Sequence, residues 1–170
     1  MFKLLCVFAV YFAVICAEEK KAEITWGRII KGKDYPGVTI TSSKEKTDIT
    51  WNEPVNAQIN PLKLTYNIGF TKKKTTEYVK LENLCGDVKK GTSEERVKKF
   101  ILKTLTSSDD CPIKKGAKAT FKVPSISTFK SDKNQCGPYR SEFNIFRARD
   151  QGNALPIITG IFRGNITGCK

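Results

Sequence analysis

Residues 85–116 read CGDVKKGTSEERVKKFILKTLTSSDDCPIKKG, a pattern that predicts a short amphipathic helix with a cysteine on each side. Thr92 is a suitable N-cap, and Glu95, three residues later, is placed to complete a capping box. The helix is expected from Glu94 to Leu105, with its apolar stripe at helical spacing and lysines on the other faces. The stripe consists of Val97, Phe100, Ile101, Thr104 and Leu105.

Outside this stretch, short segments of alternating or β-branched residues predict strands. The clearest is residues 62–70, where apolar residues occupy every second position, and residues 78–84 form its return strand. Further strands are expected at 24–30, 38–41, 47–51, 55–59, 117–123, 139–149 and 155–167, with a long polar loop over 129–138. Many short strands at this spacing indicate an all-β fold, an antiparallel β-sandwich or open barrel.

The first 17 residues resemble a secretory signal peptide. Lys3 supplies the charge, Leu4 to Ile15 the apolar core, and Cys16 and Ala17 the small residues before a cut. This apolar run is too short for a membrane span. We therefore expect a secreted, extracellular protein with one domain over residues 18–170.

Four cysteines remain after such a cut, namely Cys85, Cys111, Cys136 and Cys169. In an oxidising compartment they predict two disulfides, and three pairings are open. We favour pairing of neighbours, Cys85 with Cys111 and Cys136 with Cys169. The first bond would clamp the helix and the second would join the last strands.

The chain is strongly basic, with 30 Lys and Arg against 17 Asp and Glu, a formal net charge of +13. Such a charge favours acidic partners, among them anionic membrane surfaces, and it is equally typical of a solvated surface that keeps a protein soluble. Secretion argues against nucleic acid. We expect a monomer.

The residue types of the chain argue against a catalytic site and against a metal site. The chain has no histidine, which removes the commonest general base and the usual catalytic triad. The acidic pairs at 94–95 and 109–110 are explained by a helix first turn and a loop end. The cysteines are too scattered for a metal site. We therefore predict a protein that is not an enzyme and holds no metal or cofactor.

Several different short motifs follow one another along the chain. They are Trp26 with GKD at 32–34, PLKL at 61–64, YVKL at 78–81 running into Cys85, CPIKKG at 111–116, FKVP at 121–124, YRSE at 139–142 and the segment 158–168. In this order they resemble the ganglioside-activator branch of the lipid-recognition proteins, and the related insect chemosensory families of the CheA and CheB type. That branch has eight cysteines in the mature chain where this one has four. The resemblance implies a cup-shaped β-sandwich with an apolar cavity that holds acyl chains or other lipids.

Candidate residues for such a cavity and its entrance follow from the aromatic positions and the helix stripe. An aromatic residue in a β-rich chain is also an ordinary core residue. The candidates are Trp26, Trp51, Tyr66, Phe70, Val97, Phe100, Ile101, Leu105, Phe129, Phe143 and Phe146. Lys98, Lys99 and Lys103 are candidates for contact with a ligand head group at the rim. Asn165 begins an N-glycosylation sequon, which predicts a glycoprotein.

Two functions remain open at this point. The first is a secreted binding or carrier protein for a lipid or other small apolar ligand, with a chemosensory role as one version of it. The second is a basic effector or antimicrobial protein that acts on anionic membrane surfaces. Salt separates them, because charge-driven binding weakens as the Debye length shrinks and cavity binding of a neutral ligand does not.

Overall fold

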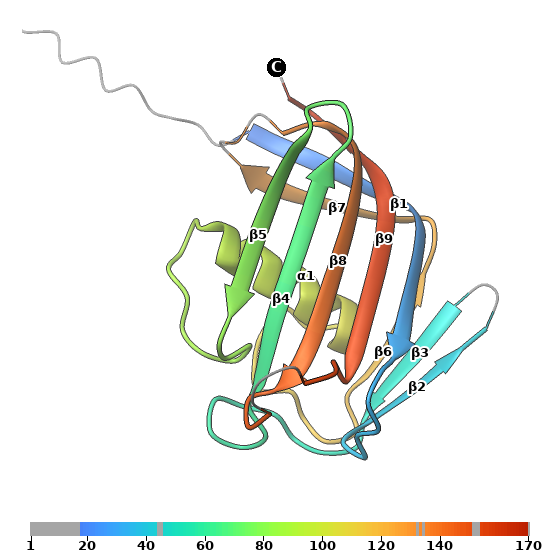
Figure 1. The fold of residues 1–170 in the computed structure, drawn as a ribbon, viewed down its shortest axis with the longest axis vertical. Coiled ribbons are helices and arrows are strands. Elements are labelled where there is room, and N and C mark those ends of the chain that lie inside the picture. The colour runs from blue at the N-terminus through green and yellow to red at the C-terminus, as the bar shows by residue number, and fades with distance from the viewer. Residues whose placement is uncertain (1–17, 44–45, 132, 134, 151–153, 170) are drawn as a thin grey trace, which may run out of the picture.

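The computed structural model describes residues 18–43, 46–131, 133, 135–150 and 154–169, so the predicted signal peptide lies outside the described residues. Its main feature is a strongly curved antiparallel sheet of six strands, in the order β5-β4-β8-β9-β1-β7 (Figure 1). These strands are β1 (Glu18–Lys31), β4 (Leu62–Phe70), β5 (Thr75–Leu81), β7 (Ser125–Ser131), β8 (Gly137–Arg147) and β9 (Ile158–Thr167). A smaller sheet has the order β2-β3-β6, with β2 at Val38–Ser42, β3 at Lys46–Trp51 and β6 at Lys118–Lys122.

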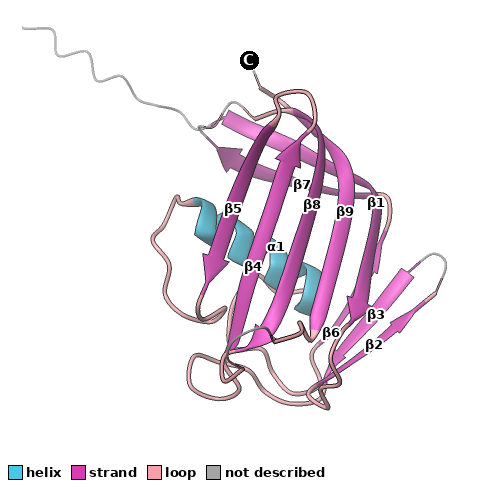
Figure 2. Ribbon diagram, in the orientation of Figure 1, coloured by secondary structure: helices cyan, strands magenta, loops and turns pink. Residues whose placement is uncertain are grey.

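One helix, α1 (Ser93–Thr106), lies on the concave face of the large sheet (Figure 2). The predicted all-β architecture with a single short helix is confirmed for the described residues. Alternation explains which strand faces point inward: Leu62, Leu64, Tyr66, Ile68 and Phe70 of β4 are all buried, whereas the residues between them are half-buried or exposed. The same alternation holds along β8. The concave face of the sheet therefore carries the core.

Two glycines in β9 allow large side chains on β8 to fold down onto this face. Gly160 lies opposite Phe143 in the register, and a Cβ at Gly160 would overlap the Phe143 ring. Gly164 lies opposite Tyr139, and a Cβ there would collide with the backbone carbonyl of Glu23 in β1. Any larger residue at these two positions would push neighbouring strands or rings outward.

Strand β1 is longer than predicted and contains a β-bulge between Ile24 and Trp26. Before the bulge, β1 pairs with β7 on one side and β9 on the other. A strict alternation from Ile24 would place Trp26 inside, but the extra residue at the bulge shifts the phase, so that Gly27 faces inward instead. Trp26 is consequently exposed, with the guanidinium of Arg163 5.3 Å from its ring centroid.

Two other predicted segments differ from the structure. The expected strand at 55–59 is absent: only Val55 pairs, in an isolated bridge with Ile113, because the Asn56 side chain accepts hydrogen bonds from Gln58 and Ile59 and closes a turn. The expected loop at 129–138 is partly strand, since β7 continues to Ser131 and β8 begins at Gly137. Pairing with the unpredicted first half of β1 explains this extension.

The helix ends agree with the sequence to within a residue. The Thr92 hydroxyl accepts from the Glu95 amide at 3.3 Å, which confirms the N-cap. The Glu95 carboxylate reaches the amide of Gly91 at 2.6 Å rather than that of Thr92. Ser107 adopts a left-handed conformation (φ 62°) and donates its amide to the Lys103 carbonyl, which ends the helix.

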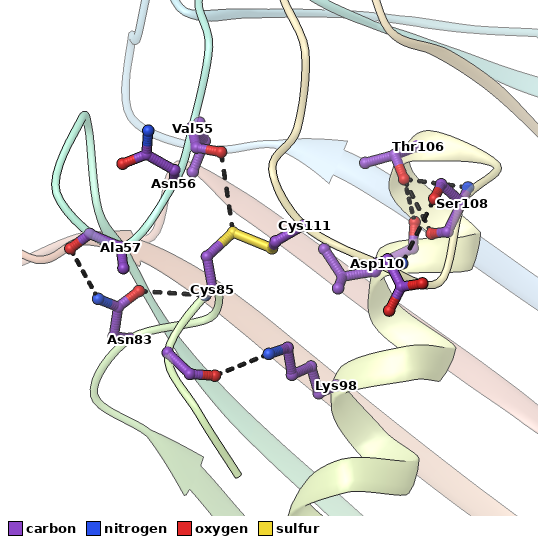
Figure 3. Close-up of a disulfide and its surroundings, with 12 residues drawn as sticks. Val55, Asn56, Ala57, Asn83, Cys85, Lys98, Thr106, Ser108, Asp110 and Cys111 are labelled. Carbon is purple, nitrogen blue, oxygen red and sulfur yellow. Dashed lines mark hydrogen bonds between the residues drawn. A yellow bond between two sulfur atoms is a disulfide. The ribbon is translucent and has the colours of Figure 1, made fainter.

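The two disulfides join Cys85 to Cys111 and Cys136 to Cys169, the favoured pairing of neighbours. Figure 3 shows the first bond between the segments that enter and leave the helix, beside the backbone of Val55. Disulfides of this kind indicate an extracellular or other oxidising compartment. Within the described residues, no helix combines the length and the apolar character that a membrane span requires.

Candidate functional site

A cavity of about 890 Å³ lies between the concave face of the large sheet and helix α1, and β7 supplies a further wall. Aliphatic and aromatic side chains line it together with polar and charged ones, and exposed residues such as Lys103 and Lys130 are among them, so it reaches the surface. This volume falls in the upper part of the range of small-molecule pockets, about 300–1,000 Å³.

Five of the predicted cavity residues line this space: Tyr66, Phe70, Val97, Phe100 and Phe129. They come from three different elements, β4, α1 and β7. The cavity thus brings together residues that are far apart in the sequence, from the clearest predicted strand and from the helix.

The helix presents two different faces to the protein. Val97 and Phe100 line the cavity and are half-buried, whereas Ile101 and Leu105 are fully buried in the core. Phe100 lies at the boundary between cavity and core. Its ring packs edge-on against Tyr66, with centroids 6.3 Å apart, and against the fully buried Phe162, at 5.9 Å.

The other predicted residues do not line the cavity. Trp51 is fully buried and its indole donates a hydrogen bond of 2.9 Å to the Leu105 carbonyl, which ties β3 to the C-terminal end of the helix. Phe143 is fully buried above Gly160, and Phe146 is half-buried on the other face of β8. Together with the exposed Trp26 and the buried Ile101 and Leu105, these residues stabilise the fold or lie on the surface.

The three predicted head-group lysines have different surroundings. Lys98 does not line the cavity, because its ammonium donates to the Gly86 carbonyl at 2.7 Å (Figure 3). Lys99 lines the cavity and pairs with Glu95 at 2.9 Å. Lys103 also lines it and is exposed. Two of the three lysines are therefore in position to meet a bound molecule.

A hydrogen-bonded group of side chains joins β5, the start of α1 and the segment between β7 and β8. The Lys133 ammonium lies 2.6 Å from the Glu77 carboxylate of β5 and 3.0 Å from the Ser93 hydroxyl at the start of α1. Burial acts to raise the pKa of Glu77, but the hydrogen bonds from Lys133 and Ser93 outweigh it, and the pKa is lowered. Glu77 is therefore an anion with its charge already compensated.

The inner surface also carries polar groups that the sequence did not single out. Burial raises the pKa of Tyr66 to about 12 and also raises the pKa of Tyr139, so both hydroxyls stay protonated. Lys20 lines the cavity and is only 2 % exposed. A usable signal was present, because Lys20 shares the two-residue period of Ala22 and Ile24, but the strand was expected to begin only at Ile24.

The described residues contain no group of three or more His, Cys, Asp or Glu side chains that could hold a metal ion. Asn165 is exposed in β9, so its sequon is accessible on the surface.

The chain matches no protein-family model and no curated protein sequence. Among solved structures it is similar to the crystal structure of the C-terminal domain of wzt, with a TM-score of 0.31 and 10% sequence identity over 90% of this chain and 78% of that one. A similarity this low carries no argument about the function of this chain.

Proposed function

We propose that this protein is a secreted binding or carrier protein for a lipid or other apolar ligand, which it holds in the β-cup. The observation that carries the proposal is the cavity of about 890 Å³ between the curved sheet and the helix. Apolar walls from β4, β5 and α1 supply the contact, and the opening at the surface supplies a route of entry. A concave space with a large apolar contact surface is the usual form of a small-molecule site, and the charged residues that also line this one could meet a polar head group.

The resemblance of the sequence to lipid-recognition proteins supports the same proposal. The two disulfides are consistent with secretion, and a chemosensory role remains one version of the function. The exposed Asn165 sequon makes an N-glycan part of the proposal, on a strand face away from the cavity. A fall in apparent mass after glycosidase treatment of protein from a eukaryotic source would demonstrate that glycan.

The test compares binding of a neutral apolar fluorophore, N-phenyl-1-naphthylamine, by three proteins. The wild type should bind it. Ala22→Phe fills the cavity from β1 and should bind it at least about tenfold more weakly. Thr25→Phe, an exposed position of the same strand, should bind like the wild type.

Salt separates this proposal from a basic protein that acts on membranes. Binding of the neutral fluorophore should change little between about 0.01 M and about 1 M salt, where the Debye length falls from about 30 Å to about 3 Å. Dye leakage from anionic vesicles, abolished by salt and unaffected by Ala22→Phe, together with no fluorophore binding, would favour the membrane-active function instead.

A further inference from the structure

Lys20 is the one charged side chain in the described part of the chain that is fully buried. It lies in β1 on the same face as Ala22 and Ile24, and all three line the cavity. Its partner in the register of β7 is Phe129, which also lines the cavity. Lys20 thus lies on the inner wall of the cup, whereas Lys103 lies at its exposed rim.

Within the described residues, Lys20 takes part in no ion pair and no side-chain hydrogen bond. Three carboxylates line the cavity, but Glu77 is paired with Lys133 and Glu95 with Lys99, and Asp109 is exposed. A lysine is almost never fully buried without a partner, because loss of hydration penalises its charge. An anion that enters from outside would remove this penalty.

Hydroxyl groups lie on the same concave face. The Ser141 hydroxyl is buried within reach of the Tyr66 hydroxyl and has no other hydrogen-bonding partner in the described structure. Tyr139, which lines the cavity, lies two strands from β1, because it is opposite Gly164 and Gly164 is opposite Ile24. These hydroxyls are neutral donors, and a donor favours an anionic or otherwise hydrogen-bonding head group over a plain hydrocarbon.

We propose that the ligand is a long-chain carboxylate and that Lys20 binds its carboxylate inside the cup, an inference that rests on the proposed function. The hydrocarbon chain lies against Ile68, Phe70 and Val79, which form the apolar wall. A carboxylate matches the unpaired lysine of the inner wall charge for charge. A phosphate monoester carries nearly two negative charges at neutral pH and would leave one uncompensated in the same place.

The wall as a whole favours an anion as well. Six cationic side chains line the cavity against three carboxylates. Lys20 differs from the other five because it is buried, so its interaction with a carboxylate is screened little by salt. The rim lysines attract the anion during entry, and Lys20 determines which head group is retained.

The experiment measures displacement of N-phenyl-1-naphthylamine by palmitic acid and by hexadecanol, which share a chain and differ in the head group. The wild type should prefer the acid by at least about tenfold, the effect expected of a charged hydrogen bond. Lys20→Met keeps the length of the side chain and removes the charge. It should lose this preference through weaker acid binding and should bind the alcohol as before. Lys21→Met, the matched variant at the next and exposed position of β1, does not touch the cavity and should keep the preference.

The outcomes separate this inference from the proposed function. If the wild type binds neither the fluorophore nor either ligand, the proposed function itself fails. If the wild type binds the fluorophore but binds acid and alcohol equally, or if Lys20→Met keeps the preference, only the role of Lys20 is overturned. Lys20→Met should fold, because it keeps the length of the side chain and removes no ion pair or hydrogen bond of the described structure.

A second measurement needs no variant. Palmitic acid labelled with ¹³C at the carboxyl reports its ionisation through its NMR shift. A neighbouring ammonium lowers the pKa of a buried carboxyl, and burial alone raises it. The bound acid should therefore titrate below the pH at which short-chain acids titrate in water. A bound carboxyl that titrates above that pH would overturn the proposal.

Discussion

Trp51 illustrates, at the scale of a single residue, why aromatic positions alone do not locate a ligand site. The sequence leaves it open whether Trp51 lines a cavity or belongs to the core. In the structure it is fully buried away from the cavity, and its indole donates to the Leu105 carbonyl. Trp26 differs for another reason, since the bulge after Ile24 turns it outward. Burial is predictable from alternation, but bulges and hydrogen-bond partners depend on strands that are distant in sequence.

Trp51→Phe should lower the free energy of unfolding by about 1–3 kcal/mol, because the buried Leu105 carbonyl loses its donor. Ligand binding per folded molecule should stay within about twofold of the wild type, because Trp51 does not line the cavity. Chemical denaturation and fluorophore titration measure the two effects. A large loss of binding with unchanged stability would mean that Trp51 belongs to the site.

Substitutions of Phe100, which lines the cavity, and of Phe162, which is fully buried in the core, can be compared to test where the cavity ends. Phe162→Ala should cost about 3–5 kcal/mol of stability, as for other fully buried phenylalanines. Phe100→Ala should cost less, because Phe100 is only half-buried, and it should also weaken uptake of the fluorophore. Equal stability losses, with uptake unchanged in Phe100→Ala, would make Phe100 a plain core residue.

At the scale of elements, the helix was predictable from local signals and its environment was not. The N-cap Thr92, the apolar stripe and the polar end all lie within the segment itself. Which part of the stripe meets the core and which meets the cavity depends on β3, β4 and β6, which pack around it from elsewhere in the chain. The unpredicted half of β1 and its partner β7 were missed for the same reason.

The contact of Glu77 with Lys133 and Ser93 predicts a pH-dependent link between β5 and the helix. The pKa of Glu77 is lowered from 4.5 in the folded protein, so its stabilisation is fully present above that pH and is lost as the pH falls through the folded value. Glu77→Gln should therefore be less stable than the wild type at pH 7, and the difference should vanish at sufficiently acidic pH.

Glu82→Gln provides the comparison for this prediction. Glu82 pairs with Lys80 at 2.6 Å, but its side chain is exposed, and an exposed pair contributes little. Urea denaturation of both variants at several pH values measures the difference. A destabilisation by Glu77→Gln that persists unchanged to the lowest pH would show that shape, not charge, explains it.

The disulfide that frames the helix should contribute about 3–4 kcal/mol, the value that chain entropy gives for a loop of 26 residues. A variant with alanine at both Cys85 and Cys111 should lose this much stability in chemical denaturation. The Cys136–Cys169 bond closes a loop of similar size, 33 residues, so a variant with alanine at both of these positions should lose a similar amount of stability. Alkylation of the denatured, non-reduced mature protein, from which residues 1–17 have been removed, should label no cysteine; labelling of two would contradict the bond pattern.

At the scale of the whole molecule, the all-β class and the single helix were predictable from periodicity and capping. Pairing of neighbouring cysteines was the favoured one of three open pairings, and the sequence alone did not decide between them. The cavity itself could be expected only from a resemblance, because its volume is a property of how the sheet curves. The bulge bends β1, and Gly160 and Gly164 leave the room that the rings of Phe143 and Tyr139 occupy, features that no single segment reveals. Lys20 was missed because its burial depends on β7.

Native mass spectrometry of the protein after incubation with a mixture of neutral and anionic lipids tests the central claim most directly. The account predicts one bound lipid per chain for the wild type and for Thr25→Phe, and none for Ala22→Phe, whose new ring occupies the cavity. Several lipids bound in equal amounts to all three proteins would indicate adsorption to the basic surface. That result, or the absence of any bound lipid, would contradict a carrier function for the cup.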